Sequence, residues 1–281
     1  MTDVHIFEPE YYRRLYEIEA GHWWSIGMRS AMQALLAGVL DEPRTIHLPD
    51  NTHDPVVRAL DIGIRALDIG CGTGFLMNVL ADTPAIKEVA GLDYSLDALR
   101  FCRLRGLSHL LQGDAGRLPH RTGSFDLIVC IDTLQHLSPA GADREGLGEM
   151  ARLLRPGGML YLRTNSALGH RRLRGVDPAR YRRYRREQLI QLVESAGLQV
   201  HRATYLNCLP SLWATLKEMI RPAGEASRAG PGLAIRMTGN RCLAQALERV
   251  LRFEAWLVGR VGLDLPFGHS LAVVARKSEP A

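Results

Sequence analysis

The feature that most constrains this chain is an apolar segment that runs directly into three alternate glycines. Residues 66–75 read ALDIGCGTGF, with glycines at Gly70, Gly72 and Gly74. Glycines at every second position allow the backbone to turn sharply, and they let bare N–H groups approach a ligand that a side chain would keep away. The segment therefore predicts a strand that ends in a turn around a nucleotide-like cofactor.

A near copy of this segment precedes it in the chain. Residues 59–63 read ALDIG, as residues 66–70 do, but the first copy continues with Ile64 and Arg65 and has no glycine turn. Only the second copy is followed by further glycines and by apolar residues at helical spacing. We therefore assign residues 59–63 to a lead-in segment and the cofactor turn to the second copy.

An acidic residue stands at the end of the next predicted strand. This strand covers residues 89–93 and ends at Asp93, where a carboxylate can accept hydrogen bonds from both ribose hydroxyls of a nucleoside. The glycines lack the dinucleotide spacing Gly-x-Gly-x-x-Gly, because Phe75 stands three residues after Gly72. This difference argues against NAD or FAD and for a cofactor without a phosphate.

Predicted strands and helices then alternate over roughly a hundred residues, which favours a mostly parallel sheet with its ligand at the carboxyl edge. A third strand leads to Asp114 and Ala115, a fourth covers residues 125–131, and a helix at 143–154 leads to a fifth strand after a Pro-Gly-Gly turn. The Asp114 carboxylate could accept a hydrogen bond from an exocyclic amine. The amide after it could bond a ring nitrogen.

Together these segments resemble the class I S-adenosylmethionine-dependent methyltransferases, over roughly residues 60–205. The resemblance implies an α/β, Rossmann-like doubly wound sheet of seven strands, mostly parallel with an antiparallel last strand. It implies S-adenosyl-L-methionine as cofactor and S-adenosyl-L-homocysteine as product. It places the cofactor-binding residues as follows: Gly70, Cys71, Gly72 and Gly74 around the methionine half, Asp93 and Tyr94 at the ribose, Asp114 and Ala115 at the adenine, and Asp132 facing the methyl donor.

The N-terminal segment adds a second resemblance. Apolar residues at helical spacing predict one helix over residues 8–37, and its His-Trp-Trp run at 22–24 is similar to the N-terminal helix of a bacterial subgroup of small-molecule methyltransferases. That resemblance implies a helix that covers the cofactor, with Trp24 and Arg29 lining the site. The subgroup's usual phenylalanine after the tryptophans is Ser25 here. The alternative is that the tryptophans only pack the helix onto the sheet.

Methyl transfer from a sulfonium requires little of the protein beyond alignment, exclusion of water and, where necessary, removal of a proton. His136, a few residues past the fourth strand, is the candidate catalytic base, although it could equally cap a turn, pack or shape the pocket. Asp132 could hold the substrate or the cofactor amine, or cap the turn that it begins. Cys130 has no preceding proline, which argues against a covalent cysteine mechanism.

A basic stretch follows the fifth strand, with arginines crowded between residues 171 and 186. Clustered arginine with interleaved tyrosine suits phosphate contact and base stacking. We favour a lid over the acceptor pocket at 166–187, which leads into an amphipathic helix and whose arginines could recognise an acidic acceptor.

The last two strands are predicted at 198–207 and 270–277, with the final strand antiparallel between the fifth and sixth. An insertion at 208–268 separates them, with helices at 209–220 and 240–260 and a Pro/Gly loop at 222–232. It could cover an acceptor pocket, form a homodimer surface or touch a membrane edge, in that order of preference. The larger side chains in it are expected to be core or dimer contacts: Trp213, Met219 and Trp256.

Composition limits the class of protein. An apolar content of 46% supports a sizeable core, and the formal charge of +5 is concentrated in the basic stretch. Five well-separated cysteines without a CxxC pair predict reduced thiols, with neither a disulfide framework nor a metal site. The sequence contains no signal-peptide pattern and no apolar run long enough to span a membrane. We expect a cytoplasmic protein with an N-terminal helical cap and loop at 1–58 and a methyltransferase domain at 59–281.

The favoured function is methylation of an oxygen, or of a nitrogen or carbon, in a small-molecule acceptor, in secondary metabolism or in glycan or lipid biosynthesis. One alternative is an RNA or protein methyltransferase that uses the arginine-rich segment. Another is a cofactor-binding protein without methyl transfer, such as a scaffold or a cyclase. Residues 131–134 read IDTL in place of the Asn-Pro-Pro-Tyr motif of adenine- and glutamine-directed enzymes, and no separate RNA-binding module is visible. A nucleic-acid partner is therefore disfavoured.

Overall fold

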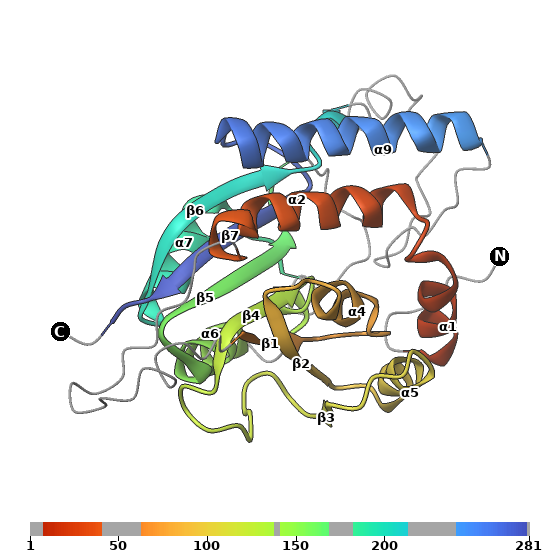
Figure 1. Cartoon of the computed structure of the whole chain (residues 1–281). Helices are drawn as coiled ribbons and strands as arrows, with labels where there is room; N and C mark the ends of the chain where they lie inside the picture. The colour runs from red at the N-terminus through yellow and green to blue at the C-terminus, as the bar shows by residue number, and fades with distance from the viewer. Residues whose placement is uncertain (1–7, 41–62, 138–140, 169–181, 213–239, 280–281) are drawn as a thin grey trace, which may run out of the picture.

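The computed structural model describes residues 8–40, 63–137, 141–168, 182–212 and 240–279 (Figure 1). Within these residues the chain forms a seven-stranded sheet with the order β3-β2-β1-β4-β5-β7-β6. Strand β7 is antiparallel to both of its neighbours, and the other neighbouring strands are parallel. The predicted fold is confirmed. The strands are β1 (Ile64–Ile69), β2 (Ile86–Asp93), β3 (Leu110–Gln112), β4 (Phe125–Ile131), β5 (Leu154–Asn165), β6 (Leu198–Leu206) and β7 (Ser270–Lys277).

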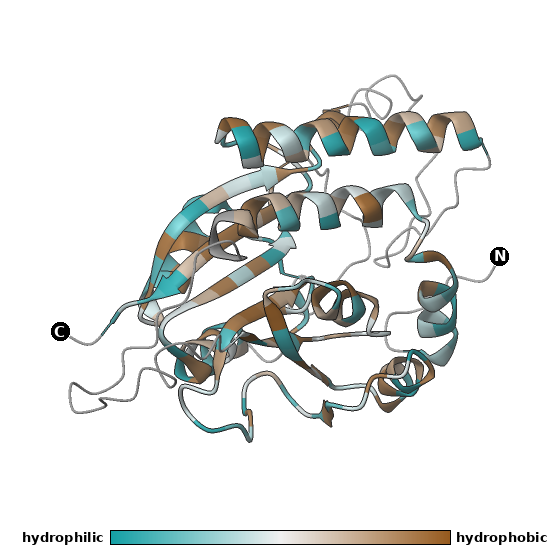
Figure 2. Ribbon diagram, viewed as in Figure 1, coloured by the Kyte–Doolittle hydropathy of each residue, from teal (hydrophilic) through white to brown (hydrophobic). Residues whose placement is uncertain are grey.

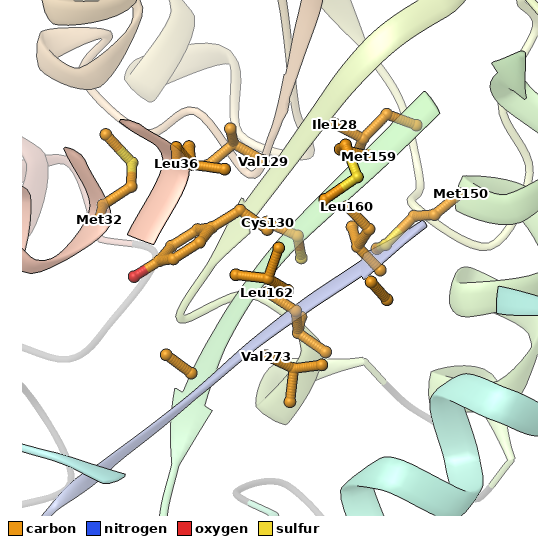
Figure 3. Packing of buried hydrophobic residues seen from close by; sticks show 14 of the residues in the cluster. Met32, Leu36, Ile128, Val129, Cys130, Met150, Met159, Leu160, Leu162 and Val273 are labelled. Atoms are coloured by element: carbon orange, nitrogen blue, oxygen red, sulfur yellow. The ribbon is translucent and has the colours of Figure 1, made fainter. Parts of the chain in front are cut away.

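Helices cover both faces of this sheet. Those of the described residues are α1 (Pro9–Ile18), α2 (Trp23–Leu40), α4 (Phe75–Ala81), α5 (Leu96–Leu104), α6 (Ala142–Leu153), α7 (Arg186–Ser195) and α9 (Arg241–Trp256), with a short 3-10 turn η1 (Leu134–His136) and a π turn η2 (Leu257–Val261). Figure 3 shows Met32 and Leu36 of α2 on one side of β4 and β5, and Met150 of α6 on the other. The central strands are accordingly almost continuous apolar runs, as expected for a parallel sheet covered on both faces.

The register of the central strands brings the site residues to one edge. Ile69 at the end of β1 pairs with Leu92 of β2 on one side and with Cys130 of β4 on the other. The three strands therefore end side by side, and the residues that follow them lie at the same edge of the sheet. Strand β5 begins at Leu154, before the expected Pro-Gly-Gly turn, and the β4–β5 register shifts near Phe125.

The predicted single helix over residues 8–37 is wrong. Helix α1 ends at Ile18, and α2 begins at Trp23 after a break at 19–22 that contains Gly21, a residue that weakens helices. The break lets the Glu19 carboxylate turn toward the glycine turn. There Oε1 accepts hydrogen bonds from the Thr73 hydroxyl and from Nη2 of Arg105 at 2.6 Å. The first copy of the repeat, at 59–62, and the predicted domain boundary at residue 58 lie outside the described residues.

The basic segment at 166–187 is described only at its two ends, because residues 169–181 lie outside the described ranges. Arg182 pairs with Asp143 of α6 at 3.1 Å, and the buried Tyr184 donates its hydroxyl to the same carboxylate at 3.0 Å. The predicted amphipathic helix after this segment is confirmed as α7, which buries Leu189 and Val193. Arg182 and Tyr184 are therefore packed against α6, whereas Arg185 is exposed.

Helix α9 lies on the outer side of α2, as Figure 1 shows. The second predicted helix of the insertion is thus confirmed, and residues 208–212 begin the first one. Trp213, Met219 and the loop at 222–232 lie outside the described residues. Trp256 is 51% exposed, so it is not a core residue, and the alternative of a dimer contact stays a prediction. Leu251, Ala255 and Val258 occupy the inner face of the helix instead.

Small residues set the distance between α2 and α9. A Cβ atom added at Gly259 would lie 2.5 Å from the Cβ of Ala34 and 3.1 Å from its backbone oxygen. A Cβ atom at Gly27 would lie 2.4 Å from the Cβ of Leu251. The two helices therefore approach more closely than larger residues would permit.

Gly259→Ala tests this close contact. Because backbone atoms of Ala34 cannot move aside as a side-chain end can, we expect the variant to lose about 1–3 kcal/mol in the free energy of unfolding. Gly148→Ala is the matched control, since Gly148 lies exposed in α6 with nothing within 4 Å of the added carbon. The control should be neutral or more stable by about 0.5–1 kcal/mol. Equal urea midpoints for the two variants would contradict the packing described.

Candidate functional site

A cavity of about 600 Å³ lies at the carboxyl ends of β1, β2 and β4. Helices α1 and α2 form its other wall. The structure brings together at this cavity nearly all of the residues expected from the sequence: Gly70, Cys71, Gly72, Asp93, Tyr94, Asp114, Ala115, Asp132, His136, Trp24 and Arg29. A volume of this size is typical of a small-molecule or cofactor site.

Gly74 does not line the cavity. It precedes α4 with a positive φ of 79°, and a Cβ atom there would lie 2.5 Å from Cδ1 of Leu107 and 2.9 Å from Sγ of Cys102. The third glycine of the turn therefore allows close packing of α4 and α5. Gly74 does not contribute to the lining of the cavity.

The second glycine does face the cavity. Gly72 has a φ of +55°, and a Cβ atom there would meet only Cδ2 of Leu15, at 3.9 Å. Its amide donates to Oδ2 of Asp93 at 2.8 Å, and the amide of Ser95 donates to Oδ1 of the same carboxylate at 2.8 Å. Burial raises the pKa of Asp93, while these backbone hydrogen bonds lower it. The carboxylate is thus fixed beside an open stretch of backbone.

Asp68 is a site residue that the sequence analysis missed. It is 2% exposed, lies in β1 two residues before Gly70, and its Oδ2 atom has no hydrogen-bond partner among the described residues. Burial raises the pKa of Asp68 to about 8, and the negative charges of Asp93 and Glu19 add to the effect. The available signal was an acid inside an otherwise apolar strand immediately before the glycines.

Arg163 of β5 was missed as well. It is buried, and its Nη2 atom donates to Oδ2 of Asp132 at 2.5 Å, while its guanidinium lies 4.8 Å from the centre of the Trp24 ring. Asp132 has a φ of +53°, a conformation that costs energy outside glycine and persists only where the surroundings hold it. The ion pair and the Trp24 ring supply such surroundings at the end of β4.

The orientation of His136 is set by its neighbour Gln135. Oε1 of Gln135 accepts hydrogen bonds from the Thr164 hydroxyl at 2.9 Å and from the Asn165 amide at 3.0 Å, which turns its Nε2 atom toward Nε2 of His136 at 3.4 Å. An amide nitrogen only donates, so this network assigns the imidazole proton to Nδ1. Burial lowers the pKa of His136. The ring is therefore neutral near pH 7.

Arg29 lines the cavity and also braces the break between α1 and α2. Its Nη1 atom donates to the carbonyl of Glu19 at 3.0 Å and its Nη2 atom to that of Ala20 at 3.2 Å. Its guanidinium lies 4.5 Å from the centre of the Phe75 ring. The arginine thus joins the N-terminal helices to the start of α4.

Within the described part of the chain, no group of three or more His, Cys, Asp or Glu side chains could hold a metal ion. No helix in those ranges is both long and apolar enough to cross a lipid bilayer. The cysteines Cys71, Cys102, Cys130, Cys208 and Cys242 form no disulfide in this structure.

Comparison with known proteins places this geometry in a family. Residues 67–162 match the methyltransferase domain family. The chain is 30% identical over 155 residues to a protein of Encephalitozoon cuniculi that is named as a methyltransferase, a match that covers 48% of this chain and 70% of that protein. The chain belongs to the class I S-adenosylmethionine-dependent methyltransferases.

Two bacterial relatives of this methyltransferase are named as O-methyltransferases. It is 36% identical over 118 residues to the ubiquinone biosynthesis O-methyltransferase of Xanthomonas oryzae, covering 40% of this chain and 47% of that protein. It is 38% identical over 110 residues to the fatty-acid O-methyltransferase of Mycolicibacterium smegmatis, covering 38% and 39%. The methyltransferase thus spans less than half the length of these two curated relatives.

A solved structure resembles the whole fold. One chain of the complex between the Haloferax volcanii Trm112 methyltransferase activator and a methyltransferase aligns with a TM-score of 0.57 at 18% identity, covering 99% of this chain and 100% of that one. At this identity the likeness shows only that the two chains share a fold.

Asp68→Asn tests the burial of the acid in β1. Because the pKa of Asp68 is raised to about 8 in the folded chain, from an ordinary value of 3.8, the native state binds more protons than the unfolded state between these values. The free energy of unfolding then falls as the pH rises through this range. The asparagine variant lacks this titration, so its stability relative to the parent should increase by roughly 1–2 kcal/mol between about pH 6 and about pH 8. A difference that stays constant with pH in urea unfolding would show that Asp68 titrates normally.

Proposed function

We propose that this methyltransferase transfers the methyl group of S-adenosylmethionine to an oxygen atom of a small-molecule acceptor. One cavity supports the proposal, since its lining joins the glycine turn to Asp132 and His136. The two bacterial relatives named as O-methyltransferases, one for ubiquinone biosynthesis and one for fatty acids, support oxygen as the target atom.

The cavity wall fits the cofactor. The open side of Gly72 leaves room for a ligand against bare backbone, and the unpartnered Oδ2 of Asp68 offers a buried acceptor to a positively charged group. We assign the methionine half to the glycine turn with Gly70, Cys71 and Gly72, the ribose hydroxyls to Asp93 with Tyr94, and the adenine to Asp114 and Ala115. Trp24 and Arg29 close the site from α2.

The bound cofactor supplies an activated methyl group on a sulfonium. The protein's part is then to align the acceptor, exclude water and receive a proton. A neutral His136 on the cavity wall can take the proton of an acceptor hydroxyl at Nε2 once that atom is released from the Gln135 amide, because the amide contact occupies its lone pair. We assign Asp132, held by Arg163, to orienting the reacting groups at the end of β4.

An RNA or protein acceptor is less well supported. Arg182 and Tyr184, which belong to the arginine-rich segment proposed for such a partner, are tied to Asp143 and are largely buried. They are therefore poorly placed to contact a phosphate backbone. A homodimer through residues 208–268, an anionic acceptor and a cytoplasmic location stay predictions.

Gly72→Val and Asp93→Ala test the cofactor assignment. The valine places a branched side chain in the open space beside the turn at a positive φ, and the alanine removes both the ribose acceptor and the tie to the Gly72 amide. Each variant should weaken S-adenosylmethionine binding at least tenfold in titration calorimetry, about 1.4 kcal/mol or more. Gly148→Ala is the control and should bind normally. Unchanged affinity in both site variants would overturn the assignment.

Transfer of a labelled methyl group from S-adenosylmethionine tests the reaction. We expect label in phenolic or carboxylic small molecules when panels of both classes are supplied, and none in bulk transfer RNA or protein. With the acceptor found, His136→Gln should lower kcat by about 10²–10⁴ and leave the cofactor Kd unchanged. Label in RNA would favour the alternative acceptor class. An unchanged kcat would remove His136 from the role of base.

A further inference from the structure

Exposed large apolar side chains concentrate in the segment that separates β6 from β7. Within the described residues, most of them lie between residues 208 and 268, including Leu243, Phe253, Trp256, Val261 and Leu263. A concentration of this kind on one segment marks a surface that meets another body. In Figure 2 brown and teal residues alternate along the whole of α9, the outermost helix of the molecule in that view.

The outer face of α9 combines aromatic rings with arginines. Arg249, Phe253, Trp256 and Arg260 recur at intervals of three and four residues, so they lie along one face, and all four are exposed. The rings of Phe253 and Trp256 stack with their centres 5.7 Å apart. The pair therefore forms one flat apolar surface with a cation at each end.

The acids of the same helix do not cancel this charge. Glu254 is buried, and it accepts hydrogen bonds from the backbone amides of Cys208 at 3.1 Å and Leu209 at 2.7 Å. Glu248 pairs with Arg252 at 2.9 Å. The face of Phe253 and Trp256 thus presents apolar and positively charged groups together.

We propose that this face of α9, defined by Arg249, Phe253, Trp256 and Arg260, docks on an anionic lipid surface. A helix with aromatic and aliphatic groups interleaved with arginine lies in the plane of a lipid interface, where the rings enter the headgroup region and the guanidinium groups meet phosphates. Leu243 and Val261 are also exposed, toward the two ends of this helical segment, but their helical spacing places them to one side of this face.

Charge and composition favour lipid over two other occupants. A symmetric contact between two copies would bring the same surface together from each, so Arg249 and Arg260 would face arginines of the second copy. A nucleic acid would attract the arginines and could stack on Phe253 and Trp256, but the exposed aliphatic groups Leu243, Val261 and Leu263 offer it neither stacking nor hydrogen bonds. An anionic bilayer offers phosphates to the arginines and an apolar interior to the aliphatic and aromatic groups.

Helix α9 is connected to the cavity through helix α2. Helix α2 presents Trp24 and Arg29 to the cavity and carries α9 on its outer side (Figure 1). The surface role is nevertheless independent of the proposed reaction, because no residue of α9 lines the cavity.

Vesicle sedimentation of the full chain tests this proposal. We expect binding to vesicles that contain phosphatidylglycerol, weak binding to pure phosphatidylcholine, and release as salt is added. The double variant Arg249→Ala/Arg260→Ala should bind roughly 25-fold more weakly, about fivefold for each arginine. Vesicles should also shift the tryptophan emission of the parent to the blue, and Trp256→Phe should abolish that shift.

Arg100→Ala and Leu104→Ala are the matched controls, since both residues are exposed on α5, at the opposite end of the molecule from α9 (Figure 1). Both should bind vesicles as the parent does. The proposal is overturned if anionic vesicles are not bound, or if the double variant binds as tightly as the parent. Two other results would also overturn it, provided that the parent does not bind vesicles. One is a dimer in sedimentation velocity that the double variant does not form, and the other is an RNA complex in a mobility shift that the double variant does not form.

Discussion

The burial of several carboxylates around one cavity is the constraint on which the rest of this site depends. Asp68, Asp93 and Glu19 are all removed from water, and burial raises the pKa of each. Backbone amides donate to Asp93 and the Arg105 guanidinium to Glu19, whereas Oδ2 of Asp68 has no hydrogen-bond partner among the described residues. Asp68, whose pKa is raised to about 8, therefore favours its uncharged form near pH 7.

The same carboxylates organise the wall that α1 contributes. Glu19 draws together the Thr73 hydroxyl of the glycine turn and Arg105 from the loop after α5. The guanidinium of Arg105 also stacks on the Tyr16 ring, 4.3 Å from its centre, and donates to the Thr73 carbonyl at 2.9 Å. One buried ion pair thus holds an N-terminal helix, a turn and a loop in register, and its position decides how α1 meets the cavity.

Local patterns in the sequence were sufficient to predict the parts of the site that follow a strand directly. The apolar runs before Gly70, Asp93 and Asp132 specify parallel strands, and parallel strands bring their carboxyl ends to one edge. Residues whose role depends on a distant partner were not predictable in this way: Arg163 is explained only by Asp132 and Trp24, and the orientation of Glu19 only by Thr73 and Arg105. Gly74 is a residue of the predicted motif with a different role from the one expected. Its lack of a side chain allows Leu107 and Cys102 to pack closely, and it does not face a ligand.

The contact between α2 and α9 has a mechanical consequence. At Gly259, in the π turn η2 that continues α9, the backbone lies directly against Ala34 of α2, with no intervening layer of flexible side chains. Such a joint has little compliance, so α2 and α9 behave as one stiff body. A tilt of the outer helix would therefore also move Trp24 and Arg29, which belong to α2 as Ala34 does.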